Sequence, residues 1–149
     1  MQSADSGTLV TTNGELHDDV IGFLSSGTRT AMVSYTAADG RPLIAPVWFL
    51  VEDDLLLFST GLDTAKGRAL QRDNRVALCV DDDRRPYSFV QIQGTTTLSN
   101  DPDDVVTTAR RSALRYVENE VADEWVRRIV APDEVVVRVH PTKVISHLA

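Results

Sequence analysis

The sequence predicts a mainly β protein whose antiparallel strands form a closed or nearly closed barrel, with a few helices at its periphery. About six segments have the composition and alternation of strands, and turn residues separate them. The strands do not alternate regularly with helices, which argues against a doubly wound parallel sheet. A barrel protects the edges of its strands, so it suits a sheet of this size.

The first half of the chain is expected to contain one short helix followed by a meander of strands. Thr12-Asn13-Gly14-Glu15 matches a capping box, apolar residues then recur at helical spacing from Leu16, and Gly27 can end the helix. Asp39-Gly40 is typical of a hairpin turn, and Pro46 marks an interruption of strand pairing. The strands expected here are residues 30–36, 41–52 and 55–60.

The second half is expected to add three helices and the remaining strands. One helix begins at Asp63 or Thr64 and runs to about Arg72. Another begins at Asn100-Asp101-Pro102, where proline and the aspartates favour a helix start, and helical spacing returns at 121–129. The strands expected here are residues 75–81, 87–98 and 134–139, with a last one around 144–145.

Length and charge limit the class of protein. The chain of 149 residues suits one domain, which we expect at 13–149 after a disordered tail at 1–12. The net charge of −7 argues against a nucleic-acid partner. No apolar run can span a membrane and the first residues lack the order of a secretory signal, so the predicted location is cytoplasmic. Of the 15 basic residues 13 are arginine, which indicates a GC-rich genome such as that of an actinomycete.

The usual signatures of metal and nucleotide sites are missing from the sequence. A single cysteine, Cys79, excludes an internal disulfide and a multi-cysteine metal site. The three histidines have no metal-binding spacing, so no metal is expected. There is also no P-loop, nucleophile elbow or dinucleotide fingerprint.

The segment from Phe58 to Arg68 has the strongest chemical signal. A strand ends in the hydroxyl pair Ser59-Thr60, a glycine turn follows, and a helix capped near Thr64 has Lys66 in its first turn. Free backbone N–H groups at a helix start and a nearby cation together form an anion site. Residues 61–75 carry a local charge of +2 in this acidic chain. These residues alone leave two interpretations open, a phosphate site or a lysine whose ammonium only reaches solvent.

A second candidate segment is Pro46-Val47-Trp48. Pro46 has no N–H, so it leaves a strand carbonyl unpaired and opens the ladder. The backbone around Val47 and Trp48 would then be free to face a flat heteroaromatic ring. The alternative interpretation is a bulged strand with a core tryptophan.

The order and spacing of these segments resemble the pyridoxamine-phosphate-oxidase-like split barrels. The resemblance is closest to the actinobacterial flavin/deazaflavin oxidoreductases, in particular the branch that uses coenzyme F420, and extends from about Leu16 to the end of the chain. The motifs that carry it are Gly40-Arg41-Pro42, Pro46-Val47-Trp48-Phe49, Phe58-Ser59-Thr60, Lys66, Asp73-Asn74-Arg75-Val76-Ala77-Leu78 and Val90-Gln91-Ile92-Gln93-Gly94.

This resemblance implies a split β-barrel of the FMN-binding-protein type that forms a homodimer with cofactors at the interface. It assigns a phosphate-binding turn, a segment that faces the cofactor ring and a strand near the cofactor. Trp48 and Trp125 are the candidate aromatic residues of the interface. The residues predicted to bind cofactor are Pro46, Val47, Trp48, Ser59, Thr60, Thr64, Ala65, Lys66, Arg68, Arg72 and Gln93.

Two departures from the oxidase branch favour coenzyme F420 over FMN. Relatives that oxidise pyridoxamine phosphate hold the flavin phosphate with arginines at positions that match Ala45 and Ala65. Their arginine-rich C-terminal tail is also missing, which argues against vitamin B6 chemistry. Arg68 and Arg72, one turn apart on a helix face, are placed to meet the longer anionic tail of F420.

The predicted function is that of an F420-dependent reductase, which transfers a hydride from reduced deazaflavin to a conjugated small-molecule acceptor such as an enone, a quinone or a tetrapyrrole. Tyr87 is a candidate proton donor, and solvent is the alternative. Two other functions stay open. One is an FMN-dependent oxidase or nitroreductase of the same fold, and the other is a non-catalytic carrier of flavin, F420 or haem.

Overall fold

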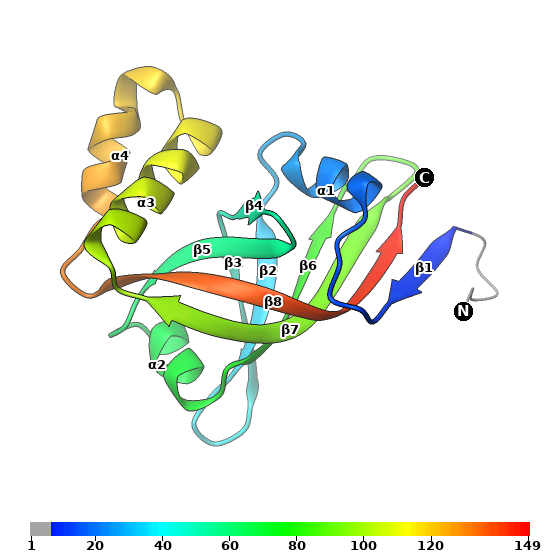
Figure 1. The fold of residues 1–149 in the computed structure, drawn as a ribbon, viewed down its shortest axis with the longest axis horizontal. Coiled ribbons are helices and arrows are strands. Elements are labelled where there is room, and N and C mark those ends of the chain that lie inside the picture. Colours follow the sequence, from blue (N-terminus) through cyan, green and yellow to red (C-terminus); the bar gives the residue numbers. More distant parts are fainter. Residues whose placement is uncertain (1–6) are drawn as a thin grey trace.

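One curled antiparallel sheet of eight strands forms the body of the protein (Figure 1). The structure, a computed structural model, describes residues 7–149. Seven strands follow the order β3-β2-β6-β7-β8-β5-β4, and β1 pairs with the last residues of β8. The strands are β1 (Thr8–Thr11), β2 (Ala31–Thr36), β3 (Pro42–Val47), β4 (Leu50–Glu52), β5 (Leu55–Gly61), β6 (Arg75–Asp81), β7 (Phe89–Ser99) and β8 (Glu134–His147). The prediction of a mainly β split barrel with peripheral helices is therefore confirmed.

Strand β8 joins the strands β3-β2-β6-β7 on one side of it to the strands β5 and β4 on the other. It can do so because it is long and pairs with three other strands. It pairs with β7 along its length, with β5 in its first half and with β1 near its end. A bulge bends it where Gln93 and Gly94 of β7 lie opposite Lys143 and Pro141. Only glycine fits there, since a Cβ on Gly94 would lie 2.3 Å from the carbonyl oxygen of His140. The sequence predicts two strands in this region because the bulge interrupts the alternation of one continuous strand.

The hydrophobic core lies inside the curl of the sheet. Val135, Val137 and Val139 of β8 point into it, together with Phe58 of β5 and Ile92 of β7, and all five side chains are buried. These side chains follow the period of two that a strand imposes. The alternation seen in the sequence therefore predicts the inner face of β8 correctly.

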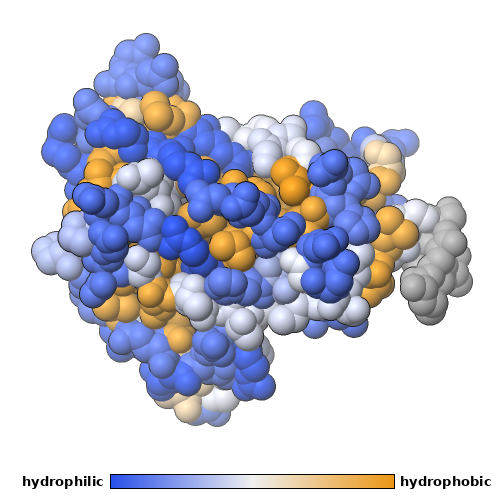
Figure 2. All heavy atoms as spheres, in the orientation of Figure 1, coloured by the Kyte–Doolittle hydropathy of each residue, from blue (hydrophilic) through white to orange (hydrophobic). Residues whose placement is uncertain are grey.

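Within residues 7–149, four α-helices lie around the sheet (Figure 1). They are α1 (Asp18–Ser25), α2 (Ala65–Arg72), α3 (Pro102–Tyr116) and α4 (Ala122–Ile129), with a 3-10 turn at Asn119–Val121. Helices α3 and α4 pack against each other, and Val105 of α3 contacts Leu57 and Val136 on the outer face of the sheet. In the part of the chain that the structure describes, no helix is long and apolar enough to cross a membrane. Figure 2 shows polar residues over much of one face, with apolar patches between them.

The predicted strand 41–52 is two strands because helix α3 takes the hydrogen bonds of Phe49. The Phe49 N–H donates to the Tyr116 hydroxyl at 3.2 Å, and the Phe49 carbonyl accepts from the Arg115 guanidinium at 2.6 Å. The chain therefore leaves the ladder after Val47, and Trp48 lies beside the α3–α4 hairpin.

The N-terminal segment differs from the sequence prediction. Residues 8–11 form β1 and pair with residues 144–147, so they are not part of a disordered tail, whereas residues 1–6 lie outside the described part. The capping box is also wrong, because α1 begins at Asp18 and no side chain caps it. The Asn13 side chain instead accepts a hydrogen bond from the Glu15 N–H at 3.1 Å, which forms a local turn. The remaining elements are present with small shifts of their ends.

Candidate functional site

A cavity of about 300 Å³ lies where the α3–α4 hairpin meets β5, α2 and the start of β8. It contains five of the residues predicted to bind cofactor, and we call it the Trp48 cavity. Its lining residues are Pro46, Val47, Trp48, Ser59, Lys66, Ser112, Arg128, Ile129 and Glu134. The fold thus brings together the two segments that the sequence singled out, although they are separated along the chain.

Trp48 forms an aromatic wall of this cavity. Its ring stacks on Tyr116, with centroids 4.9 Å apart and planes 1° apart, and tilts against Trp125 at 5.3 Å. The Tyr116 hydroxyl donates to the Arg29 carbonyl at 2.9 Å, which holds the stack in place. Burial raises the pKa of this hydroxyl. Trp48 and Trp125 therefore contact each other within one chain, and a role of either residue between two chains stays a prediction.

Lys66 reaches the Trp48 cavity from the first turn of α2. Thr64 caps this helix, since its hydroxyl accepts from the Gly67 N–H at 3.0 Å and donates to the Gly61 carbonyl at 2.8 Å. Gly67 packs so closely that a Cβ there would lie 2.0 Å from the Gly61 oxygen. This rigid turn aims a half-buried Lys66, and burial lowers the pKa of its ammonium group.

The start of α2 offers further donors to an anion. The first amides of a helix have no acceptor within the helix. In α2 the Thr64 hydroxyl accepts a hydrogen bond from the third of these amides, that of Gly67. The amides of Ala65 and Lys66 have no intrahelical acceptor and are therefore candidate donors to a ligand. A cation beside free helix amides is the arrangement that phosphate groups prefer.

Ser59 is the clearest sign of a ligand in the Trp48 cavity. Its hydroxyl oxygen is buried and has no hydrogen-bond partner within residues 7–149. A buried polar group without a partner costs about 1–3 kcal/mol, so such groups are rare and call for an explanation. Because Ser59 also lines the cavity, a rotation of its side chain would bring this hydroxyl to a polar ligand group there. The residues present therefore fit a ligand with a flat ring and an anionic group.

Glu134, the first residue of β8, lines the same cavity and is a candidate functional residue that the sequence did not indicate. The Leu62 N–H donates to the Asp133 carbonyl at 3.0 Å, which joins the turn before α2 to the start of β8. Burial, followed by the charge of Asp133, raises the pKa of Glu134 to about 7, and Lys66 opposes this. A carboxyl group that titrates near neutral pH in a cavity is a candidate for proton exchange.

Arg128 of α4 is a second lining residue that the sequence did not indicate. Its guanidinium lies 5.0 Å from the Trp125 ring centroid and pairs with Glu124 at 2.9 Å. Helical spacing relates Trp125 to Arg128, but only the packing of α4 against Trp48 places both at the cavity.

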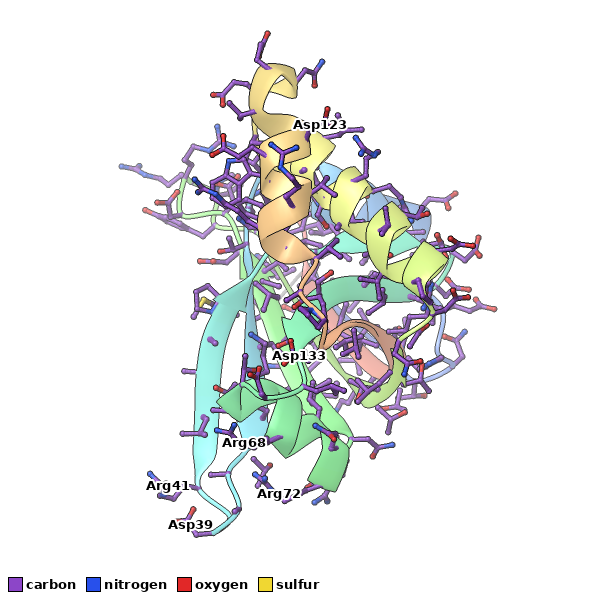
Figure 3. The ribbon with its side chains drawn as sticks, turned by 90° about the vertical axis from the view of Figure 1, so that its left-hand side faces the viewer. Asp39, Arg41, Arg68, Arg72, Asp123 and Asp133 are labelled. Carbon is purple, nitrogen blue, oxygen red and sulfur yellow. The ribbon has the colours of Figure 1, made fainter. Side chains whose placement is uncertain are left out.

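Six other predicted residues do not line the Trp48 cavity. Thr60 is buried on the core side, Thr64 serves as the α2 cap, and Ala65, Arg68 and Arg72 are exposed. Figure 3 shows Arg68 and Arg72 on α2 at the end of the molecule that carries Asp39 and Arg41. Gln93 lies on β7 and donates to Gln91 at 2.9 Å.

Tyr87, the predicted proton donor, is exposed and borders a different hollow. That hollow has a volume of about 470 Å³ and includes Cys79 and the acidic run that begins at Asp81. A further cleft of about 500 Å³ lies between Arg29 and the same acidic run. Both places concentrate carboxylates, so they suit an anionic cofactor less well than the Trp48 cavity.

The chain belongs to the pyridoxamine 5'-phosphate oxidase family. The model of that family matches residues 16–148, which is nearly the whole chain. The curled sheet described above is accordingly the flavin-binding split barrel of this family. No curated protein sequence matches the chain significantly.

Solved structures share this fold at low sequence identity. A conserved hypothetical protein from Mycobacterium tuberculosis is 18% identical, with a TM-score of 0.78 over 98% of this chain and 89% of that chain. An F420 reductase is 22% identical, with a TM-score of 0.65 over 82% of this chain and 93% of that chain. HutZ, the haem storage protein of Vibrio cholerae, is 13% identical, with a TM-score of 0.65 over 83% of this chain and 89% of that chain. At these identities the likeness shows the fold alone.

Proposed function

We propose that the protein is an F420-dependent reductase that binds its cofactor at the Trp48 cavity and reduces a conjugated small-molecule acceptor. The observation that carries this proposal is the unpartnered, buried Ser59 hydroxyl beside half-buried Lys66. Membership of a flavin-binding family supports the class of cofactor. The structural likeness to an F420 reductase supports the particular cofactor.

Each wall of the cavity has a part in this function. Lys66 and the free amides at the start of α2 bind an anionic group of the cofactor, and the Ser59 hydroxyl completes a hydrogen bond to it. The Trp48 ring, held by Tyr116, offers a flat apolar surface to a tricyclic ring. When bound, the reduced deazaflavin supplies the hydride, while the protein binds, orients and excludes water.

The preference for F420 over FMN rests on Ala45 and Ala65. An arginine at either position would add a charge-assisted contact to a phosphate, worth about 1.5–3 kcal/mol. Without both, FMN loses several kcal/mol of binding free energy. Arg68 and Arg72 are exposed one turn apart on α2, where the anionic tail of F420 can gain contacts in return.

We also infer that the working form is a homodimer with cofactor at the interface. A cavity of about 300 Å³ is at the small end for a cofactor, so a tricyclic ring with a long tail needs further walls. The β2–β3 hairpin exposes Ile44 (64%) and Met32 (37%). Apolar side chains on the same sheet face are suited to burial against a second chain.

Titration of the apoprotein with F420 and with FMN tests the cofactor. Tighter binding of F420 is expected. Tighter binding of FMN would overturn the proposal and favour an FMN-dependent oxidase or nitroreductase, which family membership makes the second candidate. Reduced F420 is then offered enones, quinones and tetrapyrroles. Binding without turnover of any acceptor would favour a carrier, as the likeness to a haem storage protein suggests.

A further inference from the structure

Two opposite charges line the Trp48 cavity without pairing. Lys66 and Glu134 both face it, and each shifts the pKa of the other through its charge. Among the ion pairs of residues 7–149, however, neither residue takes part in one. Both charged groups are therefore available to a ligand group in the cavity.

The charged groups around Glu134 come from every element that meets there. Asp133, its neighbour in the chain, and Asp63, in the turn before α2, disfavour a further negative charge at Glu134. Lys66 of α2 favours that charge. Arg128 lines the cavity from α4, but Glu124 already pairs with it. The remaining polar groups, Ser59 of β5 and Ser112 of α3, carry no charge.

The protonation of Glu134 changes what the cavity can bind. Ionised Glu134 neutralises Lys66 and repels an anion in a half-buried site, where charges are poorly screened. Protonated Glu134 carries no charge and can donate a hydrogen bond, so the cavity then presents an ammonium, a carboxylic acid and the unpartnered Ser59 hydroxyl to one ligand group. Because burial raises the pKa of Glu134 to about 7, both forms are accessible at neutral pH.

We propose that Glu134 is a specificity-determining residue that admits a phosphate group to the Trp48 cavity only together with a proton. Protonated Glu134 and the Lys66 ammonium both donate hydrogen bonds to the phosphate group. Ionised Glu134 repels the phosphate and excludes it from the cavity. The inference rests on the proposed function, because it takes the phosphate to belong to the cofactor. It goes beyond that function by coupling cofactor binding to proton uptake.

Isothermal titration calorimetry at pH 7, in two buffers of different ionisation enthalpy, tests this coupling. The probes are F420 and FMN, each compared with its phosphate-free ribityl form, which carries the same ring. We expect uptake of a fraction of a proton with the phosphate-bearing ligand that binds, and none with the phosphate-free form. Above pH 8 the affinity of the phosphate-bearing ligand should fall about tenfold per pH unit, as proton linkage requires.

Two variants assign the proton. Glu134→Gln should bind the phosphate-bearing ligand without proton uptake and with little dependence on pH between 7 and 9. Glu120→Gln, an exposed control, should behave as the parent protein. Cofactor binding without proton uptake, or uptake that persists in Glu134→Gln, overturns this inference and leaves the proposed function standing. Failure of both F420 and FMN to bind overturns both.

Discussion

Replacing Lys66 with methionine should weaken cofactor binding without unfolding the protein. Methionine keeps the length and apolar stem of the side chain and removes only the ammonium group. Lys66 is half-buried in the wall of the Trp48 cavity, so its charge acts on a ligand that is partly shielded from solvent. A charge-assisted hydrogen bond of this kind contributes about 1.5–3 kcal/mol, which corresponds to a roughly 10- to 150-fold loss of affinity.

The fold should tolerate this change because the hydrogen bonds at the start of α2 come from Thr64 and the backbone, not from Lys66. Fluorescence titration of the apoprotein with F420 measures the loss, and circular dichroism checks the fold. Arg85→Ala, on the exposed β6–β7 loop, is the matched control and should change the affinity much less. Equal weakening by both variants would show that the anion site lies elsewhere and would refute the reasoning.

Three further predictions concern stability and assembly. Gly67→Ala should lower the free energy of unfolding by about 1–3 kcal/mol in urea titrations, because its Cβ would meet the Gly61 oxygen; Gly22→Ala, with open space around it, should be neutral or stabilising, and equal effects would contradict the close packing at α2. The folded-state pKa of Glu134 lies above its ordinary value, so this group lowers stability as the pH rises from about 4.5 to about 7. The stability of Glu134→Gln relative to the parent protein should therefore increase between pH 5 and pH 8. A difference in the free energy of unfolding that stays constant over this range would contradict the raised pKa of Glu134. Ile44→Asp should convert a dimer to a monomer in sedimentation experiments, and a parent protein that is monomeric at micromolar concentration with cofactor bound would remove the dimer proposal.

Several features of the site follow from short stretches of sequence. The Ser59-Thr60 pair, the glycine turn and the Thr64 cap lie within six residues, so local rules of strand ends and helix starts predict their arrangement. Lys66 then has a defined position in the first turn of α2. The inner face of β8 is predictable for the same reason, because the side-chain period of a strand is a local property.

Other features depend on contacts between residues far apart in the chain. The break after Val47 has no sufficient local cause, since Phe49 leaves the ladder to bond with Arg115 and Tyr116, more than sixty residues later. Strand β1 exists because β8 offers it an edge, although its own sequence resembles a polar tail. A local pattern cannot reveal a partner strand of this kind.

The placement of Glu134 near Lys66 in the Trp48 cavity is the clearest example of a feature that depends on such contacts. Glu134 begins a strand whose alternation shows only that it faces away from Val135, and nothing near it in sequence indicates a lysine. Pairing of β5 with β8 places Gly61 opposite Glu134 and so sets the carboxyl beside the turn that leads to Lys66. Sequence patterns therefore identify the cation, the cap and the strand faces. The acid that faces this cation is known only from the fold, because a pKa shift arises from burial and neighbouring charges that the folded chain brings together.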